Sequence, residues 1–132
     1  MSFPALIHPA VNVGPYSKIG NGTIVMPHTV VGTNVSIGMF CLLGSLSCVG
    51  HDSTLGDFSS LGPSTTLAGS VKIGIRTAIG IGSTIREKTK IGNDVVLGAS
   101  SFLNQDLSDN VVAFGTPARV IRNRANDERY LR

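Results

Sequence analysis

An aliphatic residue occupies every sixth position of the chain from Ile7 to Leu103, and no insertion interrupts the series. If each aliphatic is place one of a hexad, place two is glycine in twelve of the seventeen hexads. Place five is small or β-branched, as in Ser17, Thr23 and Cys41. Phased positions at one fixed period are the signature of a repeat architecture. The place-one residues are Ile7, Val13, Ile19, Val25, Val31, Ile37, Leu43, Val49, Leu55, Leu61, Leu67, Ile73, Ile79, Ile85, Ile91, Leu97 and Leu103.

A six-residue unit of this kind predicts one short strand followed by a tight corner. Side chains alternate inward and outward along a strand, so places one and five both point into the core. Three units close a triangular coil of eighteen residues, and successive coils stack as parallel strands about 4.8 Å apart. We expect the place-two glycines to relieve backbone strain at the corners. The sequence therefore predicts an all-β parallel β-helix of five to six coils with a short C-terminal extension.

The handedness does not follow from the repeat, because parallel crossovers are right-handed in nearly all proteins. The hexapeptide pattern resembles that of the left-handed parallel β-helix family, and this resemblance implies the left hand.

Three regions follow from where the repeat begins and ends. Residues 1–6 form a lead-in, residues 7–108 the hexapeptide-repeat β-helix, and residues 109–132 a closing strand and turn with a basic tail. Within the last region we expect a strand at 111–114 and a turn and exit at 115–119. From about Val120 the chain is polar and is expected to be a short helix or a frayed end.

Composition excludes several classes of protein. Hydrophobic residues make up 42% of the chain and charged residues 14%, which indicates a folded core rather than disorder. No nucleic-acid module, signal peptide or membrane-length apolar run is visible, so the cytoplasm is the expected location. Five of the eleven basic residues lie in the last fourteen positions, where they suit either a phosphate-bearing ligand or a solvated tail. The two cysteines form no disulfide framework.

The three histidines are His8, His28 and His51. The γ-class carbonic anhydrases share hexapeptide repeats but need three zinc-binding histidines, two of them close together on one strand. His8 and His28 fall on one face of the predicted coil and His51 on another, so no metal is expected.

His51 stands at an outward place three and is followed by Asp52, which can orient an imidazole. One coil further on lies Gly69, which departs from the glycine column because Leu67 is followed by Ala68 and then Gly69. A glycine there leaves space beside the histidine and exposes a backbone N–H. A base next to such a donor suits acyl transfer, because the imidazole deprotonates the acceptor and the N–H polarises the thioester carbonyl. The alternative is that His51 and Asp52 form only a solvated corner.

Several segments resemble the β-helix domain of the NeuD/PglD-type sugar acetyltransferases. They are residues 7–9, residues 50–58 with the His-Asp pair followed by Gly-Asp-Phe, residues 62–74, and residues 110–121 with the closing Gly-Thr-Pro-Ala-Arg. The resemblance covers roughly residues 5 to 122. It implies an acetyl-CoA-dependent O- or N-acetyltransferase whose acceptor is a sugar or a nucleotide-linked amino sugar.

The resemblance also implies roles for individual residues. His51 would be the general base, Asp52 its partner, and Gly69 the donor to the acetyl carbonyl. Ile81 and Ala99 would line the pantetheine groove. The adenine and phosphate end of the coenzyme would lie near Gly115, Pro117 and Arg119. The coenzyme would lie between neighbouring subunits of a homotrimer.

Two departures from the family pattern stand out. Ser60 occupies the position, nine residues after His51, where family members often carry a second histidine next to the acetyl group. Family members also usually have an N-terminal α/β domain, whereas this sequence starts at the repeat. That difference keeps an alternative open, a non-catalytic trimerising module or the separated half of a larger acetyltransferase.

Apolar residues at outward positions favour an interface. Phe40 and Phe58 are eighteen residues apart and should stack, and Met39, Leu46 and Ile81 also point outward. A three-fold homotrimer would cover them, although scattered surface hydrophobes are also common.

Overall fold

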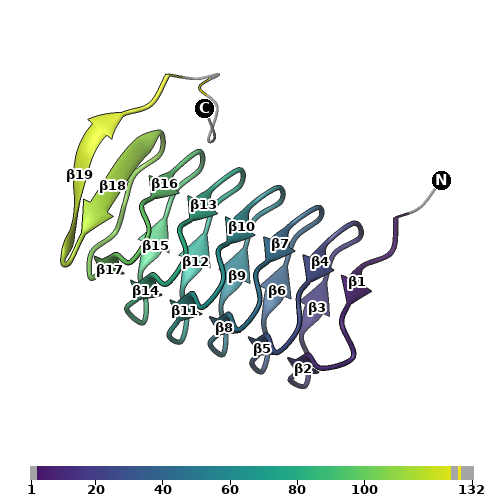
Figure 1. Ribbon diagram of the computed structural model, residues 1–132. Helices are drawn as coiled ribbons and strands as arrows, with labels where there is room; N and C mark the ends of the chain where they lie inside the picture. The colour runs from purple at the N-terminus through teal and green to yellow at the C-terminus, as the bar shows by residue number, and fades with distance from the viewer. Residues whose placement is uncertain (1–2, 126–127, 129–132) are drawn as a thin grey trace.

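The computed structural model describes residues 3–125 and 128, and its repeats wind into a triangular coil that advances by one strand spacing per turn (Figure 1). The chain turns as a left-handed parallel β-helix, which confirms the parallel β-helix predicted from the repeat and the left hand implied by the resemblance. Each strand from β1 to β14 pairs in parallel with the strand eighteen residues further on, as Leu6 does with Ile24 and Ser60 with Ala78. No helix long and apolar enough to span a bilayer exists among the residues that the structure describes.

Three sheets form the sides of the triangle. Sheet I contains β1 (Leu6–Ile7), β4 (Ile24–Val25), β7 (Leu42–Leu43), β10 (Ser60–Leu61), β13 (Ala78–Ile79), β16 (Val96–Leu97), β18 (Val111–Gly115) and β19 (Ala118–Asn123). Sheet II contains β2 (Asn12–Val13), β5 (Val30–Val31), β8 (Cys48–Val49), β11 (Thr66–Leu67), β14 (Thr84–Ile85) and β17 (Phe102–Leu103). Sheet III contains β3 (Lys18–Ile19), β6 (Ser36–Ile37), β9 (Thr54–Leu55), β12 (Lys72–Ile73) and β15 (Lys90–Ile91). We name each corner by the sheets it joins: I/II, II/III and III/I.

The aliphatic core runs along the axis of the coil. The place-one residues from Val25 to Leu103 are buried, with at most 4% of each side chain exposed. Ile7 and Val13 of the first coil are exposed, because no earlier coil covers them. Burial therefore begins only where a second coil stacks on the first, as expected for a repeat that is not stable alone.

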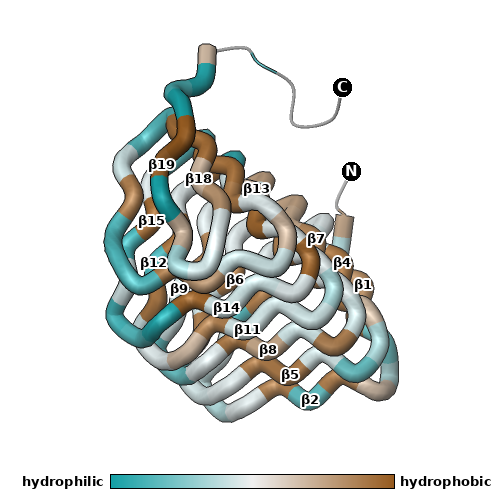
Figure 2. Tube along the Cα trace, turned by 60° about the vertical axis from the view of Figure 1, so that its left-hand side comes forward, coloured by the Kyte–Doolittle hydropathy of each residue, from teal (hydrophilic) through white to brown (hydrophobic). Residues whose placement is uncertain are grey.

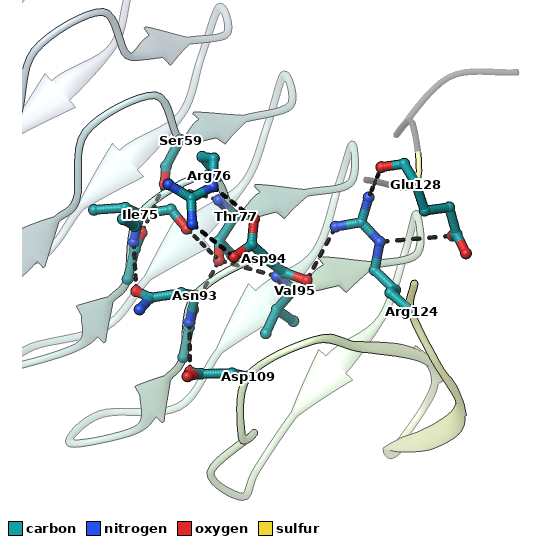
Figure 3. A network of polar contacts seen from close by, with 12 residues as sticks. Ser59, Ile75, Arg76, Thr77, Asn93, Asp94, Val95, Asp109, Arg124 and Glu128 are labelled. Atoms are coloured by element: carbon teal, nitrogen blue, oxygen red, sulfur yellow. Dashed lines mark hydrogen bonds and ion pairs between the residues drawn. The ribbon is translucent and has the colours of Figure 1, made fainter. Parts of the chain in front are cut away.

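Buried hydroxyl groups join successive coils at place five. Thr77 Oγ1 donates a hydrogen bond to the carbonyl of Gly92 at 2.7 Å and accepts one from the amide of Val95 at 3.2 Å (Figure 3). Thr23 makes the same pair of bonds, to Gly38 and from Cys41. A buried hydroxyl is tolerated only when it is hydrogen-bonded, and here it also satisfies backbone groups of the next coil.

The place-two glycines serve close packing, so the expected role in relieving corner strain is wrong. A Cβ added to Gly14 would lie 2.6 Å from the carbonyl carbon of Gly32 in the next coil. The left-handed backbone conformation lies instead at place four, which is occupied by residues such as Tyr16 (φ 63°) and His28 (φ 63°). At these glycine positions, the backbone of the next coil leaves no room for a side chain.

The C-terminal end of the coil is closed by a hairpin. The strand expected at 111–114 is confirmed as β18, which pairs with β16 in parallel and with β19 antiparallel. The turn and exit expected at 115–119 and the helix or frayed end expected from Val120 are wrong for Ala118–Asn123, which form β19. These residues pair with the edge that β18 leaves free, and a ladder there satisfies backbone groups on both strands. Residues 126–127 and 129–132 of the basic tail lie outside the described residues.

The segment after β19 returns to the body of the coil. The guanidinium of Arg124 donates to the carbonyl of Asp94 at 3.0 Å and to that of Glu128 at 2.7 Å (Figure 3). Asp94 is itself paired with Arg76, whose guanidinium holds the pKa of that carboxyl below its usual range.

Candidate functional site

His51 and Asp52 form corner II/III between β8 and β9. The imidazole Nδ1 of His51 lies 2.9 Å from Oδ2 of Asp52, and more than half of the His51 side chain is exposed. Asp52 has a φ of 61°, the left-handed conformation of place four. This corner geometry lets two neighbouring side chains on a turn reach each other, as predicted for the pair.

The second oxygen of the Asp52 carboxylate has a partner that the sequence reasoning missed. Asn34, one coil earlier in the same corner, donates from Nδ2 to Asp52 Oδ1 at 2.8 Å. The Asn34 amide, followed by the bond to His51, lowers the pKa of Asp52 from its ordinary value. A charged carboxylate accepts the proton of Nδ1–H, which leaves Nε2 of the imidazole as the free acceptor.

Gly69 stacks directly beyond His51 in the next coil. A Cβ added to Gly69 would lie 2.5 Å from His51 Nε2 and 2.6 Å from Cε1, so the imidazole occupies the space that a side chain would take. The amide of Ser70 donates to the carbonyl of His51 at 2.8 Å and fixes the two coils together. Within the described part of the chain, the Gly69 N–H donates no hydrogen bond to a protein group.

The backbone gives no reason for glycine at position 69. Its φ lies outside the left-handed region. Every other place-three residue from Pro9 to Ala99 has a side chain. The imidazole of His51 is therefore the structural reason for the irregular glycine.

The residues predicted for the pantetheine and adenine parts gather at a different corner, I/II. Ile81 is 54% exposed, and its carbonyl accepts a hydrogen bond from the amide of Ser100 in the next coil. Ala99 lies one coil beyond Ile81 in the same corner. The turn between β18 and β19 reaches the same corner, where Thr116 Oγ1 donates to the carbonyl of Ser100 at 3.2 Å. Gly115 and Pro117 belong to this turn, and Arg119 follows in β19.

Ser60 lies on neither corner. It belongs to β10 on the outer face of sheet I and lines a groove of about 340 Å³ with Met26, Leu42 and Pro63. Within one chain the structure thus brings His51, Asp52 and Gly69 together, and separately Ile81, Ala99 and the Gly115–Pro117 turn. The width of sheet II separates the two groups.

The other two histidines have separate positions. Nδ1 of His8 accepts a hydrogen bond from the amide of Ala10 at 3.0 Å within the first coil. His28 is exposed at corner I/II. Among the described residues, no group of three or more histidine, cysteine, aspartate or glutamate side chains gathers to hold a metal ion.

The solved structures that resemble this chain include acyltransferases. A perosamine N-acetyltransferase from Caulobacter crescentus, in complex with CoA and GDP-perosamine, is 33% identical with a TM-score of 0.90, over 92% of this chain and 58% of that one. The acetyltransferase domain of PglB from Neisseria gonorrhoeae is 32% identical with a TM-score of 0.89, over 91% and 58%. AntD, an N-acyltransferase from Bacillus cereus, shares the fold at 19% identity and a TM-score of 0.87.

The chain spans somewhat more than half the length of the Caulobacter and Neisseria proteins. No family model and no curated protein sequence matches it. The solved structures confirm the resemblance to the hexapeptide-repeat acetyltransferases, with which this chain shares the β-helix fold. Within the class, the Caulobacter neighbour is an amino-sugar N-acetyltransferase, as the sequence resemblance implied.

Proposed function

We propose that this chain transfers an acetyl group from acetyl-CoA to the amine of a nucleotide-linked amino sugar, with His51 as the general base. The observation that carries the proposal is the position of His51, whose Nδ1 bonds Asp52 and whose Nε2 faces Gly69. The structures of the Caulobacter enzyme with CoA and GDP-perosamine support the two substrate classes. We also propose that the protein works in the cytoplasm, the location expected from its sequence.

The reaction is a direct transfer. The acceptor amine attacks the thioester carbonyl carbon while Nε2 of His51 takes a proton from the nitrogen. The Gly69 N–H donates to the carbonyl oxygen as it becomes negative in the tetrahedral intermediate. The carbon–sulfur bond then breaks, and the imidazolium returns the proton to the leaving thiolate. The products are the N-acetylated sugar and CoA, and the charged Asp52 stabilises the transient imidazolium.

The complete site requires a second copy of the chain. Corner II/III carries His51, Asp52 and Gly69, whereas Ile81, Ala99, Gly115 and Pro117 lie at corner I/II. In a homotrimer, corner II/III of one copy can face corner I/II of the next, so that one coenzyme contacts both. Ser60 would face the acetyl end, and Arg119 a phosphate, from the neighbouring surface.

Apolar outer surface next to corner I/II supports such contact. Leu6, Ile24 and Leu42 are exposed on sheet I, and Figure 2 shows the hydrophobic colour of β1, β4 and β7 against the hydrophilic β12 and β15. At the other edge of sheet I, corner III/I, Phe40 stacks on Phe58 with ring centroids 5.7 Å apart, as the eighteen-residue spacing predicted. Contiguous apolar patches of this kind mark interaction surfaces.

The test combines coenzyme binding and turnover. Calorimetry with acetyl-CoA should show binding, and thiol release should follow addition of a nucleotide-linked amino sugar. His51→Ala should abolish thiol release while acetyl-CoA still binds. Full turnover by His51→Ala would refute the base assignment.

The alternative function is a non-catalytic trimerising module or the separated half of a larger acetyltransferase. The chain spans 58% of the length of the Caulobacter protein. A non-catalytic module predicts no acetyl-CoA binding at millimolar concentration. The separated half of an enzyme predicts acetyl-CoA binding without transfer to the acceptor, so calorimetry and thiol release together separate the functions.

A further inference from the structure

The corner that carries His51 contains one more polar side chain aimed at the pair. Asn34 lies one coil earlier in the same column, and its amide nitrogen is 2.8 Å from Oδ1 of Asp52. The other oxygen, Oδ2, is 2.9 Å from His51 Nδ1. Each carboxylate oxygen therefore has one partner, and the carboxylate plane is held from both sides.

Backbone requirements do not account for asparagine at position 34. Its φ of 58° is left-handed, a conformation that asparagine accepts more easily than most residues. The same place in other hexads is filled by Phe40, Leu46 and Arg76, which shows that the corner does not need a short polar residue. The choice of asparagine is explained by the bond that it makes.

The consequence of that bond is a fixed histidine tautomer. An amide N–H can only donate, so Asn34 favours the charged, acceptor form of Asp52. A charged carboxylate can only accept a hydrogen bond, so the imidazole donates from Nδ1–H to Oδ2, which selects the Nδ1–H tautomer. The lone pair of His51 then lies on Nε2, the nitrogen beside Gly69.

We infer that Asn34 is a positioning residue, which holds the Asp52 carboxylate so that His51 keeps Nε2 unprotonated and directed at Gly69. The inference rests on the proposed role of His51 for its functional meaning. Its structural content, the tautomer and orientation of the imidazole, does not depend on any substrate.

The test is nitrogen-15 NMR of the full chain with labelled histidine, with the His51 signals assigned by their loss in His51→Ala. Wild-type His51 should be predominantly the Nδ1–H tautomer in its neutral form. Asn34→Gly suits the left-handed φ and removes only the amide, so it should shift His51 measurably toward the Nε2–H tautomer. The carbon-13 titration midpoint of the Asp52 carboxyl should also rise, because the bond that lowers its pKa is lost.

The matched control is Tyr16→Gly. Tyr16 lies one coil before Asn34 in the same column, has a φ of 63° and is 85% exposed. This variant should leave the His51 tautomer and the Asp52 titration unchanged. Asn34→Asp places a second carboxylate against Asp52 and should raise the Asp52 titration midpoint further than Asn34→Gly does.

Turnover provides the second readout. With an acetyl acceptor, Asn34→Gly should lower kcat about tenfold and leave the Kd for acetyl-CoA unchanged, because general-base catalysis contributes 10²- to 10⁴-fold. An unchanged tautomer distribution and Asp52 midpoint in Asn34→Gly would overturn the inference. A changed tautomer in a chain that transfers no acetyl group would uphold the positioning role and refute the proposed function.

Discussion

At the scale of single residues, the site is defined by one absent side chain. The imidazole of His51 occupies the volume next to Gly69, where a Cβ would lie 2.5 Å from Nε2. Asp52 and Asn34 orient the ring from the opposite side through bonds of 2.9 Å and 2.8 Å. The imidazole is therefore held by the hydrogen bond to Asp52 on one side and by contact with Gly69 on the other.

Gly69→Ala should move the imidazole away from its position. We expect acetyl transfer to fall about 100-fold, because displacement of a catalytic group by about 1 Å costs that much. Steady-state thiol release measures this loss, and thermal unfolding checks that the coil remains intact. In a His51→Ala background, Gly69→Ala should have little effect on stability, since nothing then occupies the space. A substantial loss of stability there would show that position 69 needs glycine for another reason.

At the scale of the coil, stability depends on contacts repeated every eighteen residues. Aliphatic side chains fill the interior of the coil. Place-five hydroxyls such as that of Thr77 donate a hydrogen bond to a carbonyl of the next coil and accept one from an amide of that coil. Glycine at place two lets the backbones approach. The corners are fixed by backbone hydrogen bonds such as that from the Asp52 amide to the carbonyl of Thr33.

Thr77→Val should destabilise the protein by about 1–3 kcal/mol, because the change leaves the carbonyl of Gly92 and the amide of Val95 without their buried partner. Thr84→Val is the matched control, since Thr84 points outward on β14 and is exposed. Its free energy of unfolding should stay within about 0.5 kcal/mol of the wild type. Chemical denaturation of the two variants measures the difference. Equal effects would mean that the buried hydroxyl makes no specific contribution.

The repeat made most of the fold predictable, because a period of six leaves one consistent arrangement of strands and corners through Leu103. The pair of His51 with Gly69 was also predictable, since eighteen residues separate them. The stacking of Asn34 on Asp52 was predictable in the same way, because eighteen residues separate them. The hydrogen bond between them was not, because it depends on side-chain directions at a left-handed corner, which the period does not give. Strand β19 was missed because its pairing depends on the free edge of β18 rather than on any repeat.

At the scale of the whole molecule, one chain presents two incomplete halves of the proposed site. The catalytic group lies at corner II/III and the predicted coenzyme-lining residues at corner I/II, with the six strands of sheet II between them. A cyclic assembly joins unlike corners at every interface. Activity should therefore be a property of the oligomer.

Mixed oligomers test this expectation. His51→Ala and Ile81→Glu copies should each be inactive alone, the second because it places a charge in the proposed pantetheine groove. Co-refolded in equal amounts, they should recover about a quarter of wild-type thiol release, because a random mixed trimer holds one intact interface. Absence of recovery, with mixed trimers demonstrated by native mass spectrometry, would place the complete site within one chain.

The coil has a fixed number of residues and a fixed rise in every turn. Because each turn contains eighteen residues and adds about 4.8 Å, removal or duplication of one whole turn should preserve every inward and outward assignment. A change made between Gly69 and the β18–β19 turn would move that turn in whole steps relative to His51. The distance between His51 and the β18–β19 turn therefore depends on the number of turns between them. A β-helix of this kind can bind a longer or shorter ligand by gaining or losing a whole turn, with its other contacts unchanged.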